Sequence, residues 1–166
     1  MEYLNELIGR YRHKGLLVDT NLLLLYFLGA CDPDHIPKFK RTMMFTVAEF
    51  WFLARFLRSF DTLVTTPNVL TEVSNMSGQL GEPLRTQFYI DFANLIPQLN
   101  ENYISSSSAS SLAHFSKFGL TDVGIGELAK DTYLVLSDDL KLVSYLQKKD
   151  IDAINFNHIR TWAWEA

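Results

Sequence analysis

The chain has 166 residues, of which 48% are hydrophobic and 20% are charged. This composition predicts a single globular domain over residues 1–166 with a full hydrophobic core. A net charge of −4 at pH 7 does not indicate a strongly basic nucleic-acid-binding protein, although it leaves room for local basic patches. With Cys31 as the single cysteine, an intramolecular disulfide is not expected, and a cytoplasmic location fits.

We expect neither a signal peptide nor a membrane span. Residues 1–14 are polar and carry several charges, which a secretory signal does not. The apolar run after Asp19 is shorter than the roughly 20 residues that cross a bilayer.

Apolar runs alternate with helical patterns along the chain, and short continuous apolar runs are typical of buried parallel strands. Strands are predicted over residues 16–19, 62–66, 103–106, 133–137 and 152–156. Helices are predicted over residues 3–13, 20–29, 41–60, 84–99, 120–131 and 139–150, and one more begins at Pro67. The serine tract 105–111 is expected to be a flexible surface loop. This alternation predicts an α/β sandwich with a mostly parallel sheet.

Acidic residues lie where the predicted strands end and where neighbouring helices begin. Asp19 ends the first strand inside an apolar run, and Asp138 and Asp139 follow the fourth strand. Glu72 lies early in the helix after the second strand, and Asp122 lies in the first turn of a later helix. Because functional groups gather at the carboxyl ends of parallel strands, we expect these acids to converge at one edge of the sheet.

Carboxylates that converge repel one another, so they need raised pKa values or a bound cation. Oxygen ligands alone suit hard divalent ions, and the set therefore predicts a Mg²⁺ or Mn²⁺ site suited to phosphodiester hydrolysis. Taken singly, the acids have simpler explanations. The aspartates could cap helices or favour the positive end of a helix dipole, and Glu72 could be a solvated helix residue.

Four motifs, in order along nearly the whole chain, resemble those of PIN-domain nucleases, which include VapC-like toxins. An apolar–apolar–Asp–Thr–Asn motif is matched by "LLVDTN" at 16–21, and an acid after the second strand is matched by Glu72. A third acid is matched by Asp122, and a Ser-x-Asp motif by "SDD" at 137–139. The resemblance implies a three-layer α/β/α sandwich with a mostly parallel five-stranded sheet.

The resemblance also implies a metal-dependent endoribonuclease that hydrolyses single-stranded RNA, with the toxin of a toxin–antitoxin pair as one form. Its implied partners are an RNA substrate, a protein inhibitor (antitoxin) and a second copy of the chain as a homodimer. Asp138 competes for the fourth acidic position, for which the Ser-x-Asp spacing favours Asp139. The implied catalytic residues and ligands of Mg²⁺ or Mn²⁺ are Asp19, Glu72, Asp122 and Asp139, and the supporting residues are Thr20, Asn21, Ser137 and Asp138.

Two other classes of protein remain open. A catalytically inactive PIN-like scaffold that binds RNA or protein would usually have lost one of the acids. An α/β phosphotransfer domain would need a second acid near Asp19, and Asn21 stands where a phosphatase of this kind would have it.

Three further features could serve binding. Basic residues in segments 10–14 and 38–41 could contact RNA phosphates or simply be solvated. The aromatic helix within 43–60 is expected to be buried in the core or against a partner. Trp162 and Trp164 could also pack against a partner.

Overall fold

The structure, a computed structural model, describes residues 2–161 and contains a five-stranded sheet. The strand order is β3-β2-β1-β4-β5, and every pair of neighbours is parallel. The strands are β1 (Leu16–Val18), β2 (Leu63–Thr65), β3 (Asn100–Glu101), β4 (Leu134–Ser137) and β5 (Ala153–Asn155). The predicted α/β class is confirmed, and the sheet is parallel throughout rather than mostly so.

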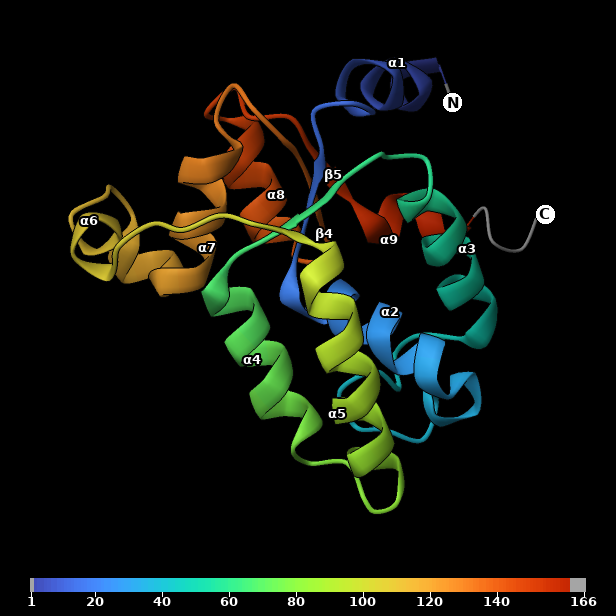
Figure 1. The fold of residues 1–166 in the computed structure, drawn as a ribbon. Helices are drawn as coiled ribbons and strands as arrows, with labels where there is room; N and C mark the ends of the chain where they lie inside the picture. Colours follow the sequence, from blue (N-terminus) through green and yellow to red (C-terminus); the bar gives the residue numbers. More distant parts are fainter. Residues whose placement is uncertain (1, 162–166) are drawn as a thin grey trace.

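Helices cover both faces of this sheet (Figure 1). They are α1 (Glu2–Tyr11), α2 (Thr20–Cys31), α3 (Val47–Leu57), α4 (Pro67–Ser77), α5 (Leu84–Leu95), α6 (Ser106–Ser110), α7 (Phe115–Ala129), α8 (Leu140–Gln147) and α9 (Phe156–Ile159). Two 3-10 helices, η1 (Pro33–His35) and η2 (Ile96–Gln98), follow α2 and α5. From β1 the chain first adds β2 and β3 on one side of the sheet and then crosses to add β4 and β5 on the other. Because crossovers between parallel strands are right-handed, α2, α4 and α5 cover one face of the sheet, and α7 and α8 cover the opposite face. The result is a three-layer α/β/α sandwich.

The core centres on β1 and α2. Leu16, Leu17 and Val18 are fully buried because β1 lies between β2 and β4 and is covered on both faces. All four leucines of segment 22–25 are buried because α2 packs against α3, α4 and α5 as well as the sheet. This enclosure explains why the sequence after Asp19 is apolar without periodicity.

The third strand and the serine tract differ from the prediction. The third strand is Asn100–Glu101, not residues 103–106, and its exposed side chains show no apolar pattern because it pairs with β2 only through the backbone at the edge of the sheet. Residues 106–110 form the short helix α6 instead of an irregular loop. The Ser105 hydroxyl accepts the backbone N–H of Ser108 and caps this helix, which is a role that serine favours.

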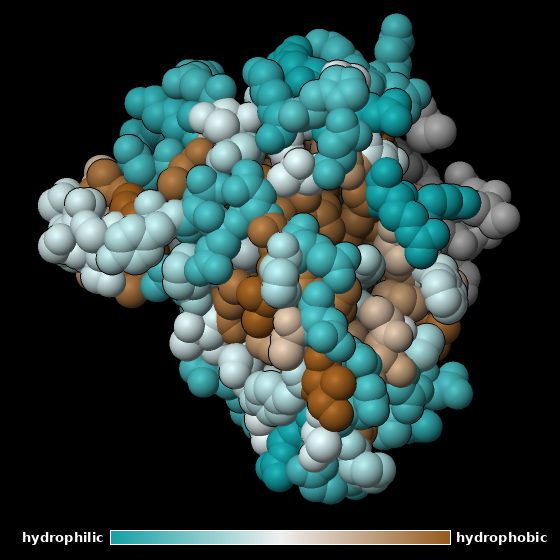
Figure 2. Space-filling model, viewed as in Figure 1, coloured by the Kyte–Doolittle hydropathy of each residue, from teal (hydrophilic) through white to brown (hydrophobic). Residues whose placement is uncertain are grey.

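The predicted helix over 41–60 begins only at Val47, after a series of turns. Thr46 and Glu49 form a reciprocal capping box at its start. Phe50 of α3 is buried, while Trp51 is 54% exposed, so this helix is a core helix with one outward aromatic side chain. Figure 2 shows further hydrophobic surface where α5 runs, and Ile90 of that helix is 52% exposed.

The C-terminal half contains two more differences. Helix α7 is interrupted at Gly119 with φ 76° and ψ −173°, so the helical segment predicted from residue 120 follows this break, and an additional segment from Phe115 precedes it. Helix α9 was not predicted. Trp162 and Trp164 lie outside the described residues. Within residues 2–161, no helix has the length and apolar character that crossing a membrane requires.

Candidate functional site

Asp19 lies at the carboxyl end of β1, between the sheet and the first turn of α2. Its backbone N–H donates to the carbonyl of Leu136 at 2.9 Å, which continues the pairing of β1 with β4. Its carboxylate accepts the backbone N–H of Thr20 at 2.6 Å and the hydroxyl of Ser137. Asp19 is the N-cap of α2, which confirms the helix-capping role considered for it in the sequence analysis. Its side chain is also buried, with only 7% of the residue exposed.

The environment of Asp19 favours its neutral form. Burial raises the pKa of this carboxyl to about 6, and the negative charges of Asp138 and Asp139 act in the same direction. The hydrogen bonds from Ser137 and Thr20 oppose this shift but are too weak to cancel it. A buried acid with a pKa near neutrality is typical of functional sites, although structural networks also produce one.

Glu72 reaches the same region from α4 and is held by two hydroxyl groups. Thr20 donates to one carboxylate oxygen at 3.0 Å, and Thr121 donates to the other. These bonds connect the start of α2 with the middle of α4 and the middle of α7. The sequence analysis assigned Thr20 a supporting role but missed Thr121, whose only signal was its position next to Asp122.

Asp122 shows that the acids from separate segments come together. The pKa of Asp122 is raised to about 7. Burial is the largest cause, and the negative charges of Asp19, Asp139 and Glu72 add to the rise, with Asp19 contributing most of the three. Each of these charges lies on a different segment of the chain, so four acids share one electrostatic environment at the carboxyl edge of the sheet. The structure therefore brings together the four acids that the sequence analysis selected.

Asp138 and Asp139 occupy different positions after β4. Asp139 is exposed and caps α8, accepting the backbone N–H groups of Lys141 at 2.7 Å and Leu142 at 3.2 Å. Asp138 is half-buried and accepts the amide of Asn21 at 3.2 Å. Burial raises the Asp138 pKa, whereas the Asn21 hydrogen bond lowers it. Both acids border the site, one as a helix cap and one as the partner of Asn21.

Two residues after β5 also reach this region. The sequence analysis missed Asn157, and it considered Arg160 only as a basic residue that could contact RNA phosphates or be solvated. Asn157 of α9 donates its amide to the carbonyl of Asp138 at 2.7 Å. Arg160 donates to the carbonyl of Met44 at 3.2 Å, and its positive charge lowers the pKa of Asp138. Since α9 itself was not predicted, neither residue could be placed beside the acids.

The basic segments noted in the sequence make contacts elsewhere. Arg10 pairs with Glu6 at 2.7 Å and with Asp152 at 2.9 Å. In the second segment, Arg41 donates to the amide oxygen of Gln79 at 3.2 Å. These contacts favour the interpretation as surface charge.

The chemistry of the acidic cluster fits a hard divalent cation. Its donors are carboxylate oxygens, and the charges that raise the pKa of Asp122 are all negative. An ion would relieve this repulsion, and oxygen ligands are those that Mg²⁺ and Mn²⁺ prefer. In the conformation described for residues 2–161, however, no three Asp, Glu, His or Cys side chains are arranged as a ready-made metal site.

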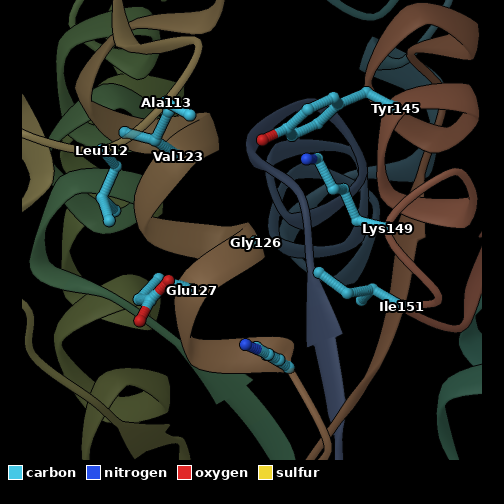
Figure 3. Close-up of a pocket in the computed structure, with 9 residues that line it drawn as sticks. Leu112, Ala113, Val123, Gly126, Glu127, Tyr145, Lys149 and Ile151 are labelled. Carbon is cyan, nitrogen blue, oxygen red and sulfur yellow. The ribbon is translucent and has the colours of Figure 1, made fainter.

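Of the cavities along α7 among the described residues, one adjoins the acids and another does not. A cavity of about 520 Å³ between the start of α4 and the first half of α7 is lined by both Glu72 and Asp122. Figure 3 shows the other, of about 210 Å³, where Tyr145 of α8 and Lys149 point toward Val123 and Gly126 of α7. None of the four acids lines this second cavity.

Comparison of the chain with protein-family models, with curated proteins and with solved structures finds no match. The function of the chain is therefore inferred from its own residues and from the geometry of the acidic cluster.

Proposed function

We propose that the chain is a Mg²⁺- or Mn²⁺-dependent endoribonuclease of the PIN-like type that hydrolyses single-stranded RNA. The observation that carries the proposal is the convergence of four acids from separate segments. The Ser137 hydroxyl bonds to Asp19 and to the backbone N–H of Asp139, Thr20 next to Asp19 bonds to Glu72, and Glu72 and Asp122 line one cavity. Such a concentration of negative charge costs stability unless it serves to bind a cation. Its position at the carboxyl edge of a parallel sheet is where α/β proteins bind ligands.

In this proposal Asp19, Glu72, Asp122 and Asp139 hold the ion. When bound, the ion would neutralise phosphate charge, lower the pKa of water and stabilise the leaving oxygen. The protein supplies the orientation of the ligands. Ser137 fixes the carboxylate of Asp19, while Thr20 and Thr121 fix the two oxygens of Glu72.

Asn21 and Asp138 support the site from its border. The amide of Asn21 holds the side chain of Asp138, and Asn157 holds its backbone carbonyl. Both contacts fix the turn between β4 and α8, in which Asp139 lies. Asp138 could also replace Asp139 as the fourth ligand.

The proposal extends to the partners that the resemblance implies. These are a protein inhibitor, if the chain is the toxin of a toxin–antitoxin pair, and a second copy of the chain in a homodimer. We also propose that the protein is located in the cytoplasm.

One group of contacts favours the second candidate, a catalytically inactive scaffold. Asp19 and Asp139 each cap a helix, and both oxygens of Glu72 accept hydroxyl groups. These bonds give the acids a structural role that needs no ion. A carboxylate oxygen has more than one acceptor site, however, so the same bonds leave room for a metal ligand.

Cleavage of a labelled single-stranded RNA in the presence of Mn²⁺, Mg²⁺ or EDTA tests the proposal. We expect cleavage with either metal, none with EDTA, and loss of cleavage in Asp19→Asn. Glu127→Gln, which changes an exposed acid of α7 outside the cluster, serves as the matched control and retains activity. If the wild type cleaves neither RNA nor DNA and calorimetry detects no Mn²⁺ binding, the nuclease proposal is wrong and the catalytically inactive scaffold remains as the candidate function.

A further inference from the structure

The cavity beside the acidic cluster combines two kinds of wall. Glu72 and Asp122 form its charged side, which it shares with the cluster. The remaining lining is neutral and comes from Pro67, Asn68 and Thr71 of α4 and from the segment Phe118–Thr121 of α7. A group placed in this cavity would therefore lie directly next to anything bound at the acids.

The charges of the lining decide which part of a nucleic acid can enter. Among residues 2–161, no lysine or arginine lines the cavity, and its two charged lining residues are acids. A phosphate placed in the cavity without an ion would be repelled. A nucleobase is neutral, and it offers a flat apolar face together with a polar edge. The ring of Phe118, which packs against Tyr145 with 4.6 Å between ring centroids, can contact the face, and the amide of Asn68 and the hydroxyl of Thr71 can contact the edge.

Asn68 is the residue best placed to read the edge of a base. It lies in the first turn of α4, one turn before Glu72, and is half-buried. Its amide makes no hydrogen bond to other residues within the described range 2–161, unlike Asn21 and Asn157, whose amides are both engaged. A side-chain amide carries a donor and an acceptor side by side, so it can form a bidentate pair with a base.

The backbone break at Gly119 shapes the opposite wall. Its φ of 76° and ψ of −173° lie in a region that side chains other than glycine do not readily adopt. This break separates Phe118 from Thr121 and Asp122, so one short segment contributes an aromatic ring and an acid to the same cavity.

We propose that this cavity between α4 and α7 binds one nucleobase of the RNA strand next to the cleaved phosphate, and that Asn68 determines which base it accepts. This inference rests on the proposed nuclease function. It adds that cleavage is selective for the base at one position of the strand.

The first test measures binding apart from cleavage. Short single-stranded RNAs made only of A, C, G or U are titrated by fluorescence anisotropy with Ca²⁺ in place of Mg²⁺ or Mn²⁺, so that a hard cation neutralises the acids, and the RNA is checked by gel to be intact. We expect the wild type to prefer one base by about 5- to 100-fold, the discrimination that a bidentate amide–base pair gives. In Asn68→Ala the four affinities should converge, and in Asn68→Asp, which loses the donor, the order of preference should change.

Asn75→Ala provides the matched control, since Asn75 is an exposed asparagine two turns further along α4 and does not line the cavity. It should retain the wild-type preference. An equal affinity of the wild type for all four RNAs, or a preference that persists in Asn68→Ala, would overturn the inference.

The second test maps cleavage sites in a mixed-sequence RNA with Mn²⁺. We expect cleavage at one base in the wild type and at several in Asn68→Ala. Unselective cleavage by the wild type would overturn the base-binding inference but leave the nuclease proposal intact. Selective binding without any cleavage would support the base-binding cavity and overturn the nuclease proposal.

Discussion

The hydroxyl of Ser137 donates a hydrogen bond to the Oδ2 atom of Asp19 and so connects the carboxyl ends of β4 and β1. The same hydroxyl oxygen accepts the backbone N–H of Asp139 at 3.0 Å. One buried side chain therefore positions two acids of the candidate site.

Replacing Ser137 tests this connection. Ser137→Ala removes the hydrogen-bond partner of the buried Oδ2 atom of Asp19 and that of the N–H of Asp139, and we expect a loss of about 1–3 kcal/mol in the free energy of unfolding. Urea denaturation of the metal-free protein measures it. Ser116→Ala, at an exposed position of α7, should change the free energy much less. Equal losses in the two variants would contradict the prediction.

The raised pKa of Asp19 predicts how stability depends on pH in the metal-free protein. The ordinary value is 3.8, and the value in the fold is about 6, so between these pH values the folded protein retains a proton that the unfolded chain releases. Stability therefore falls as the pH rises through this interval. By pH 7 the loss from Asp19 is on the order of 3 kcal/mol, since each pKa unit corresponds to about 1.4 kcal/mol.

Asp122 contributes in the same direction, and its pKa of about 7 extends the decline to neutral pH. Denaturant midpoints measured between pH 4 and 8 should show this decline in the wild type. In Asp122→Asn the decline should be shallower, because the asparagine does not titrate. A wild type whose stability rises over this whole range would contradict the prediction.

Divalent metal should reverse this loss of stability. At pH 7 we expect Mn²⁺ or Mg²⁺ to raise the melting temperature, with a gain of about 2.7 kcal/mol at a free-ion concentration one hundred times the dissociation constant. Differential scanning fluorimetry with EDTA as reference measures the change. Asp19→Asn should abolish it, whereas Glu127→Gln should show the full shift. A shift of equal size in Asp19→Asn would place the ion elsewhere.

Gly119 should be intolerant of a side chain for reasons of conformation alone. A Cβ atom added there would meet nothing within 4 Å, so no clash is expected. Its backbone conformation is nevertheless strained for any L residue, and Gly119→Ala should lower the free energy of unfolding by about 1–3 kcal/mol. Gly81→Ala is the matched control, because Gly81 also has open space around it but lacks the positive φ. Similar effects of the two substitutions in urea denaturation would contradict the argument.

The sequence was most informative where burial is complete. Strand β1 and helix α2 were predicted closely because their continuous apolar runs reflect enclosure on all sides. Strand β3 was misplaced because an edge strand of two residues is specified by backbone pairing and leaves no apolar pattern. The start of α3 was missed, although its capping box Thr46-x-x-Glu49 was a readable signal.

The acids of the site were selected from their positions at strand ends, and the structure brings them together. Their hydrogen-bond partners were harder to predict. The bond from Thr121 to Glu72 spans 49 positions, and the break at Gly119, two residues before Thr121, was not foreseen either. Asn157 and Asn68 belong to no sequence motif that would have marked them as site residues. A single asparagine has neither the periodicity of a helix face nor the spacing of a ligand set, so its role could not be predicted from the sequence.

The position of β1 in the middle of the sheet has a consequence for synthesis. Strand β1 emerges early from the ribosome, but its neighbour β4 and the bond between Ser137 and Asp19 involve residues 118 positions later. Until β4 has been translated, the nascent chain exposes one side of β1 and cannot bring the acids together. Contacts this distant in sequence also slow folding. The acidic site is thus assembled late, and a chain interrupted before Ser137 would lack it.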